Sequence, residues 1–124
     1  MTKNLSKKTI LIVDDDPSSL ILYTEILLST GAVVLCANDG EMTLLILSQQ
    51  TIDLVLLDLK LPDMSGFSIL QEIRQKYKQV KVMAQTAFAM DINRECLEAG
   101  FDDCITKPVE MDRLLVKISA LLLQ

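Results

Sequence analysis

Residues 54–66 read Leu54-Val55-Leu56-Leu57-Asp58-Leu59-Lys60-Leu61-Pro62-Asp63-Met64-Ser65-Gly66, and this stretch decides the fold. Four aliphatic residues in a row are typical of a strand buried on both faces of a parallel sheet. The run ends at one carboxylate, Asp58, and a loop then leads to the expected start of a helix at Gly66. Pro62 gives this loop a fixed backbone point and Gly66 a permissive one. We therefore predict a strand, a loop and a helix, with a carboxylate where the strand ends.

The same arrangement recurs along the chain. Three further runs of strand length stop at polar side chains: 10–13 before Asp14-Asp15-Asp16, 80–85 before Thr86, and 104–106 before Lys107-Pro108. A Val-rich run spans 32–37, and segments of helix length lie at about 17–31, 40–50, 65–77, 87–99 and 111–123. This alternation predicts right-handed crossovers and one parallel sheet with helices on both faces. The polar stops would then meet at the carboxyl edge, where open α/β sheets build their sites.

Short-range signals mark the ends of several helices. Asp16 can cap the first helix with Pro17 at its first position, where a missing N–H costs nothing. Gly31 and Gly100 are natural left-handed ends for two helices. The triplet at 38–40 could form a hairpin turn, but the apolar residues that follow do not alternate, so a helix over about 40–50 is preferred.

Size and charge limit the class of protein. The 124 residues, 50% of them hydrophobic, fit one globular domain, with residues 1–8 as a polar lead-in and 9–124 as the domain. No apolar run approaches the roughly 18 residues of a membrane span, and 9–13 is too short for a signal-peptide core, so we expect a cytoplasmic protein with no membrane insertion. The net charge of −5, without a long basic run, argues against direct nucleic-acid binding.

The histidine and cysteine content excludes several chemistries. The chain has no histidine, which rules out Ser-His-Asp and Cys-His catalysis within it. Cys36, Cys96 and Cys104 show no CxxC spacing, and we interpret all three as small buried hydrophobes in a reducing compartment. Carboxylates, hydroxyls, amines and an oxygen-bound metal remain as the available chemistry.

The acids at the strand ends form the candidate site. Alone, the run 14–16 is compatible with a solvated turn and a helix cap, and Asp58 with an ordinary cap or turn acid. If both meet at one sheet edge, their carboxylates repel one another unless a cation joins them. Oxygen ligands without histidine favour Mg²⁺, which keeps several waters and meets substrate phosphate. In this setting Asp58 fits a carboxylate nucleophile that forms an aspartyl phosphate.

Thr86 and Lys107 complete the candidate site. Taken singly, Thr86 is compatible with a strand-end cap and Lys107 with a surface lysine. Together they supply the hydroxyl donor and the positive charge that a phosphorylated carboxylate needs. The bond from Lys107 to Pro108 can be cis or trans, and the physics of the sequence leaves this open.

These residues resemble the response-regulator receiver domain of two-component phosphorelays. The resemblance covers about 9–123 and rests on Asp14-Asp15 after an aliphatic run, on 56–66 as quoted above, and on Thr86-Ala87, Ala99-Gly100-Phe101-Asp102-Asp103 and Lys107-Pro108. It implies a flavodoxin-like (βα)5 sandwich with a five-stranded parallel sheet in the order 2-1-3-4-5. The sequence from Ala99 to Pro108 is also similar to that of receivers attached to hybrid histidine kinases.

The resemblance implies the roles of the acids. Asp58 is the phosphoacceptor and takes its phosphoryl group from a phosphohistidine on a histidine kinase or a histidine phosphotransfer protein. Asp15, Asp58 and the main-chain carbonyl of Lys60 ligate Mg²⁺, and Asp14 acts largely through bound water. The domain is then a phosphoacceptor with self-phosphorylation and self-dephosphorylation chemistry, and not a turnover enzyme.

The resemblance also implies a switch. Lys107, preceding a cis proline bond, pairs with the phosphoryl group, and Thr86 moves to hydrogen-bond it. This couples the site to the face built by the fourth and fifth strands and helices. The family's aromatic residue three positions before the lysine is replaced here by Cys104. The large residues Lys60 and Phe88, two positions beyond Asp58 and Thr86, predict slow self-dephosphorylation because they hinder an in-line water.

Three other classes of protein fit the residues less well. A haloacid-dehalogenase-like phosphatase carries a second Asp two residues after its nucleophile, where this chain has Lys60. A degenerate receiver that only binds proteins conflicts with the complete set of acids, Thr86 and Lys107. Flavodoxin shares the topology, but an acidic first loop repels a flavin phosphate. The cognate kinase, the oligomeric state, including a phosphorylation-dependent dimer, and attachment to a longer protein stay open.

Overall fold

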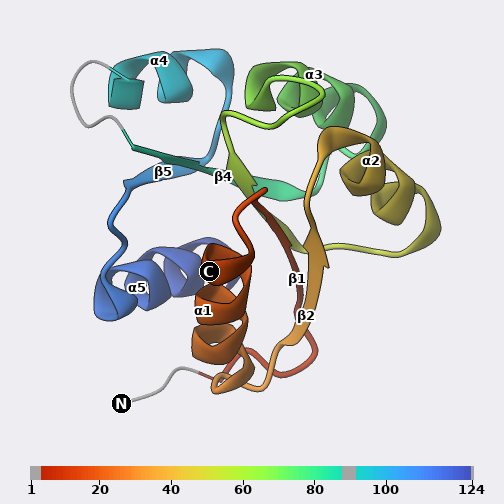
Figure 1. Ribbon diagram of the computed structural model, residues 1–124. Coiled ribbons are helices and arrows are strands. Elements are labelled where there is room, and N and C mark those ends of the chain that lie inside the picture. The colour runs from red at the N-terminus through yellow and green to blue at the C-terminus, as the bar shows by residue number, and fades with distance from the viewer. Residues whose placement is uncertain (1–3, 88–91, 124) are drawn as a thin grey trace.

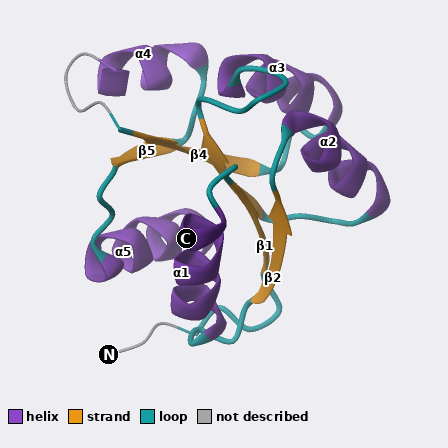
Figure 2. Cartoon of the chain, in the orientation of Figure 1, coloured by secondary structure: helices purple, strands orange, loops and turns teal. Residues whose placement is uncertain are grey.

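The computed structural model describes residues 4–87 and 92–123, in which strands and helices alternate (Figure 1, Figure 2). The strands are β1 (Thr9–Val13), β2 (Val33–Ala37), β3 (Leu54–Asp58), β4 (Lys81–Thr86) and β5 (Asp103–Thr106). The helices are α1 (Pro17–Leu28), α2 (Gly40–Gln49), α3 (Gly66–Lys76), α4 (Ile92–Ala99) and α5 (Met111–Leu122). The strands form one parallel sheet in the order β2-β1-β3-β4-β5, which confirms the predicted fold class and topology.

Helices cover both faces of the sheet. In Figure 1, α1 and α5 lie on one face, and α2, α3 and α4 lie on the other. The strands feed two apolar clusters, with Ile10, Ile12, Leu54 and Leu56 facing α1 and α5, and Leu11, Val13, Val55 and Leu57 facing the opposite helices. Because β1 and β3 are buried on both faces, their aliphatic runs need no polar alternation. Burial of each such side chain stabilises the folded state by about 1.5–3 kcal/mol relative to an exposed one.

The helix ends follow the predicted signals closely. Asp16 caps α1 by accepting the Ser18 N–H at 3.0 Å, and Pro17 is the first helical residue. Gly31 and Gly100 have φ angles of +88° and +110°, in the left-handed region that glycine adopts without strain.

Two helix boundaries differ from the prediction. α1 ends at Leu28, three residues before Gly31, because Ser29 and Thr30 turn the chain by bonding back to the last carbonyls of the helix. The helix predicted over 87–99 is described from Ile92 onward, and Ala87 lies in a bend. Among the described helices, none is long and apolar enough to cross a bilayer.

The segment assigned to a polar lead-in contains a core residue. Leu5 is fully buried in the cluster on the α1 and α5 face, and its N–H donates to the Thr30 carbonyl at 2.8 Å. A single aliphatic residue among polar ones thus fills the end of the core, and residues 4–8 pack onto the domain.

The prediction that all three cysteines are buried is wrong for Cys36. Cys96 and Cys104 are buried, but Cys36 is exposed, with its sulfur 3.3 Å from the Thr24 hydroxyl. Cys36 lies on β2, which is the edge strand of the sheet. An edge strand has a neighbour on one side only, so its side chains are covered less than those of central strands.

Candidate functional site

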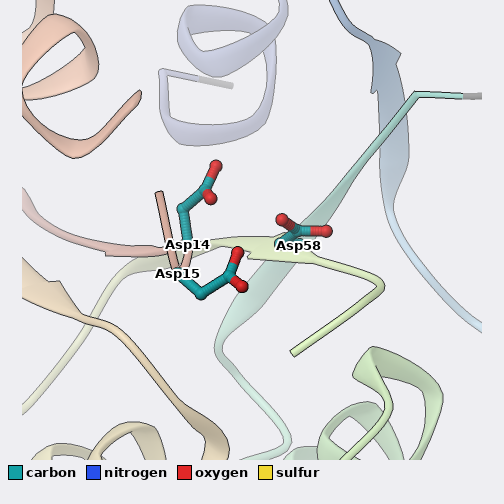
Figure 3. Close-up of side chains that lie close together, drawn as sticks. All are labelled: Asp14, Asp15 and Asp58. Atoms are coloured by element: carbon teal, nitrogen blue, oxygen red, sulfur yellow. The ribbon is translucent and has the colours of Figure 1, made fainter. Parts of the chain in front are cut away.

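Asp14, Asp15 and Asp58 lie close together at the carboxyl edge of the sheet (Figure 3). Asp14 and Asp15 directly follow β1, and Asp58 ends β3. The two strands are parallel neighbours with Val13 opposite Leu57, so the register brings their ends together. One oxygen from each carboxylate lies within 4.8 Å of the other two. The structure therefore assembles the acids that the strand-end pattern predicted.

The two acids after β1 have different surroundings. Asp14 is fully buried, whereas Asp15 is exposed. One oxygen of Asp14 accepts the Asp16 N–H at 2.9 Å, which turns the chain toward α1. Successive residues of an extended chain point to opposite sides, and this separates the inner acid from the outer one. Asp15 is thus open to an incoming ligand, and Asp16 serves as the helix cap.

Lys107 joins the two buried acids. Its ammonium lies 3.0 Å from Asp14 and 3.2 Å from Asp58, and its bond to Pro108 is cis, as the resemblance implied. Burial by itself lowers the pKa of Lys107, but its hydrogen bond to Asp14 and the charge of Asp58 outweigh burial and leave the pKa above its ordinary value. The lysine is therefore charged at neutral pH and pairs with both buried carboxylates.

The surroundings of Asp58 raise the pKa of its carboxyl group. Burial raises the pKa of the Asp58 carboxyl, and the charge of Asp14 raises it further, although the Lys60 N–H and Lys107 work in the opposite direction. The Lys60 N–H donates to one Asp58 oxygen at 3.0 Å, and Lys107 contacts the other. Both oxygens are thereby oriented, so the Asp58 carboxylate is held in place from two sides.

The donor set fits a divalent cation that prefers oxygen. Asp14, Asp15 and Asp58 carry three negative charges in a space where Lys107 supplies one positive charge. Such an excess of converging carboxylates raises their pKa values unless a cation compensates. Carboxylate oxygens with an open, solvated side suit Mg²⁺ or a similar hard cation. The ligand types present are therefore those that the sequence predicted for Mg²⁺.

The β4 and β5 side of the site contains Thr86 and Cys104. Thr86 is buried at the end of β4, and its carbonyl accepts the Lys107 N–H at 2.7 Å. Cys104 is buried in the cluster shared with Cys96 on the α4 face. Burial raises the pKa of the Cys104 thiol, which opposes thiolate reactivity and a redox role. Phe88, predicted to hinder water, lies outside the described residues.

Sequence reasoning missed two buried residues next to the site. Gln85 is fully buried, and its amide donates to the Val13 carbonyl at 3.1 Å, which braces the residue before Asp14. Tyr23 of α1 is buried near the same charges, and burial is the main cause that raises its pKa to about 12. A glutamine inside an apolar strand was the one available signal, and nothing local pointed to Tyr23.

Comparison with known proteins identifies the family. The model of the response regulator receiver domain matches residues 10–119, and the chain belongs to this family. It is 42% identical over 106 residues to the sensor histidine kinase RcsC of Salmonella typhi, a match that covers 85% of this chain and 11% of that protein. The chain thus spans a small part of this relative. Receiver domains act in two-component signalling, where phosphoryl transfer with histidine kinases or phosphotransfer proteins is the general function.

Solved structures support the same conclusion. A CheY-like receiver domain from Methanospirillum hungatei JF-1 superposes with a TM-score of 0.87 at 36% identity and 93% coverage of both chains. The receiver domain of the sensor histidine kinase PA1611 from Pseudomonas aeruginosa PAO1 superposes with a TM-score of 0.86 at 31% identity, covering 94% of this chain and 98% of that one. That neighbour holds a magnesium ion coordinated in its active-site cleft.

Proposed function

We propose that Asp58 is the phosphoacceptor of this receiver domain and that it takes its phosphoryl group from a phosphohistidine on a histidine kinase or histidine phosphotransfer protein. The observation that carries this proposal is the convergence of Asp14 and Asp58 on one ammonium, that of Lys107, in a chain of the receiver family. The match to RcsC favours a hybrid kinase as the protein that contains such a domain.

In the proposed step, an oxygen of the Asp58 carboxylate attacks the phosphorus atom of the donor. An O–P bond forms while the P–N bond to the partner's histidine breaks, and its electron pair goes to the imidazole nitrogen, which then takes up a proton from water. The Lys60 N–H holds one Asp58 oxygen at 3.0 Å, which leaves the oxygen on the Lys107 side to react. Lys107 then exchanges a carboxylate partner for the oxygens of the phosphoryl group.

Asp14, Asp15, Asp58 and the main-chain carbonyl of Lys60 would hold Mg²⁺ at this site. When bound, Mg²⁺ neutralises charge on the phosphoryl oxygens during transfer. Asp15 offers the exposed carboxylate, while Asp14 is fully buried and already accepts the Asp16 N–H and the Lys107 ammonium. This difference supports a direct ligand role for Asp15 and a role through bound water for Asp14.

We propose that Thr86 and the β4–β5 side of the domain pass the phosphorylation signal from the site to the surface. Thr86 hydrogen-bonds the phosphoryl group on Asp58, and the change reaches the surface of α4, β5 and α5. Cys104, a small side chain, occupies the place of the family's aromatic relay, so the signal passes through the backbone link from Thr86 to Lys107 rather than through a rotating ring.

A transfer assay tests the proposed function against a phosphatase. The chain is mixed with Mg²⁺ and either a phosphohistidine-loaded phosphotransfer domain or acetyl phosphate, and bound phosphate and free phosphate are both measured over time. A receiver reaches about one phosphoryl group per chain, while inorganic phosphate rises only as fast as that group is lost. Continuous release of many phosphates per chain without a labelled protein would identify a phosphatase and contradict the proposal.

A further inference from the structure

The loop between β3 and α3 has a second anchor, which lies outside the acidic cluster. Asp63 of this loop reaches the N-terminus of α2, where its two carboxylate oxygens accept the N–H groups of Gly40 at 2.8 Å and of Glu41 at 2.9 Å. These contacts join positions more than twenty residues apart in the chain. A carboxylate is favoured at a helix N-terminus, and the Gly40 N–H is the main cause that lowers the pKa of Asp63.

Close packing reinforces this anchor. A Cβ atom added at Gly40 would lie 2.2 Å from Cγ and 2.4 Å from Sδ of Met64, the neighbour of Asp63. Real Cβ atoms do not approach other atoms so closely, so any larger residue at position 40 would require the flexible Met64 side chain to move from its present place against α2. The loop and the helix thus meet through two hydrogen bonds and one tight contact.

The other end of the loop is joined to the acidic cluster. The Lys60 N–H donates to Asp58 at 3.0 Å, and Lys60 also forms an antiparallel bridge with Ser65. The Gly66 N–H donates to the Leu59 carbonyl at 2.9 Å, which closes the loop on itself. Asp63 and Lys60 are thus only three positions apart in a loop that is closed by these contacts.

The N-terminus of α2 is capped by two different aspartates. Asp39 is the N-cap of α2 and accepts the Met42 N–H through its side chain at 2.8 Å and the Thr43 N–H through its carbonyl at 3.2 Å. Asp63 takes the remaining two N–H groups of the first turn from a distant segment. The helix end is thus shared between a local cap and a residue of the loop.

We propose that Asp63 is a positioning residue that clamps residues 59–65 against α2 and so holds the Lys60 backbone in the geometry that the cation site at Asp15 and Asp58 requires. This inference rests on the proposed function, because it assigns Lys60 a metal-ligand carbonyl. Residues that orient ligands from outside typically change metal affinity by about 10–100-fold when they are replaced.

Two alanine variants at the same helix end test the clamp. Asp63→Ala removes the loop's carboxylate, and Asp39→Ala removes the local cap with the same change of charge. By calorimetric titration with MgCl2, we expect Asp63→Ala to weaken Mg²⁺ binding about 10-fold and Asp39→Ala to stay within about twofold of the native chain. Both should unfold at a lower urea concentration than the native chain, with similar shifts of the midpoint, because each removes a cap. Equal Mg²⁺ affinities for the two variants would overturn the clamp and leave Asp63 as a second cap.

Hydrogen exchange tests the clamp without metal. Backbone amides of 59–65 should exchange faster in Asp63→Ala than in Asp39→Ala, and Asp63→Asn, which keeps one acceptor oxygen, should lie between native and alanine in both exchange and Mg²⁺ affinity. If Asp63→Ala does not fold, the asparagine variant carries the test, and a native-like Mg²⁺ affinity there contradicts the clamp. A native chain that labels on Asp58 while Asp63→Ala binds Mg²⁺ normally rejects only the clamp, whereas a native chain that neither binds Mg²⁺ nor labels rejects the proposed function as well.

Discussion

The two edges of the sheet use aspartate in opposite ways. At the amino edge, Asp53 accepts the Thr9 N–H at 2.8 Å, and Asp102 accepts the Val82 N–H at 2.8 Å together with the guanidinium of Arg74. At the carboxyl edge, Asp14 and Asp58 face each other across the ammonium of Lys107.

The difference lies in the partners and not in the residue type. An acid that accepts a backbone N–H from the neighbouring strand makes a charge-assisted hydrogen bond that helps to hold the two strands together. Acids that converge on each other repel, and such an arrangement persists where chemistry requires it. A groove by itself is a poorer guide to the functional site than converging acids. A groove of about 600 Å³ lies between the ends of α2 and α3, and its lining residues include no acid.

Of these variants, Lys107→Met should have the largest effect on the chemistry at the carboxyl edge. Losing the charge that faces the phosphoryl group should slow labelling of Asp58 by acetyl phosphate about 100-fold, the usual cost of one transition-state donor. Lys117→Met is the matched control, since Lys117 pairs with Asp103 at 3.1 Å away from the cluster. Initial labelling rates check the difference, and an equal loss in both variants would contradict the role of Lys107.

Arg74→Ala should lower the stability of the fold at the amino edge and leave the labelling of Asp58 unchanged. Arg74 donates to the carbonyls of Val80 and Gly100 and pairs with Asp102, so its loss should cost about 2 kcal/mol in urea unfolding. Labelling of Asp58 should stay native once the chain is folded. Lys76→Ala removes only an exposed pair with Glu72 and should cost less than about 0.5 kcal/mol. Slower labelling of Asp58 in folded Arg74→Ala would contradict the claim that the amino edge serves stability alone.

Asp58→Asn should stabilise the metal-free chain at neutral pH. A carboxyl whose pKa is raised by folding favours the folded state below its unfolded pKa, and that contribution is lost as the pH rises through the folded pKa. At pH 7 the buried charge is then a net cost, and asparagine removes it, for a gain of about 1 kcal/mol. Unfolding in EDTA should show this gain at pH 7 and its decline toward pH 3. Asp53→Asn should instead be destabilised, and a loss in both variants would contradict the contrast.

Lys60→Ala should have the smallest of these effects. Removing the side chain two residues beyond Asp58 should open the path of an in-line water and shorten the aspartyl-phosphate lifetime several-fold. Phe88→Ala is expected to act in the same direction. Decay of the labelled protein after removal of the donor measures both lifetimes. If neither lifetime changes, bulk at these positions does not control hydrolysis.

The sequence predicted what depends on strand direction and failed where distant contacts decide. Asp14, Asp58, Thr86 and Lys107 were predictable because each directly follows or ends a strand, and parallel strands bring these ends to one edge. The hydrogen bonds of Asp63 to Gly40 and of Gln85 to Val13 were not, because their partners are 23 and 72 positions away.

Two further residues show what a local pattern conceals. Leu5 looked like part of a polar lead-in because its neighbours are polar, yet one buried side chain is enough to attach the segment to the core. Cys36 looked buried because its run is apolar, but its strand is at the edge of the sheet. Burial depends on the position of a strand in the sheet order, which a single run of residues does not encode.

One measurement tests the central contrast most directly. The native chain, Asp58→Asn and Asp53→Asn are incubated with acetyl phosphate and either Mg²⁺ or EDTA, and intact mass is recorded. The account predicts the mass of one added phosphoryl group in the native chain and in Asp53→Asn with Mg²⁺, little or none in EDTA, and none in Asp58→Asn. Equal labelling of Asp58→Asn and the native chain would contradict it.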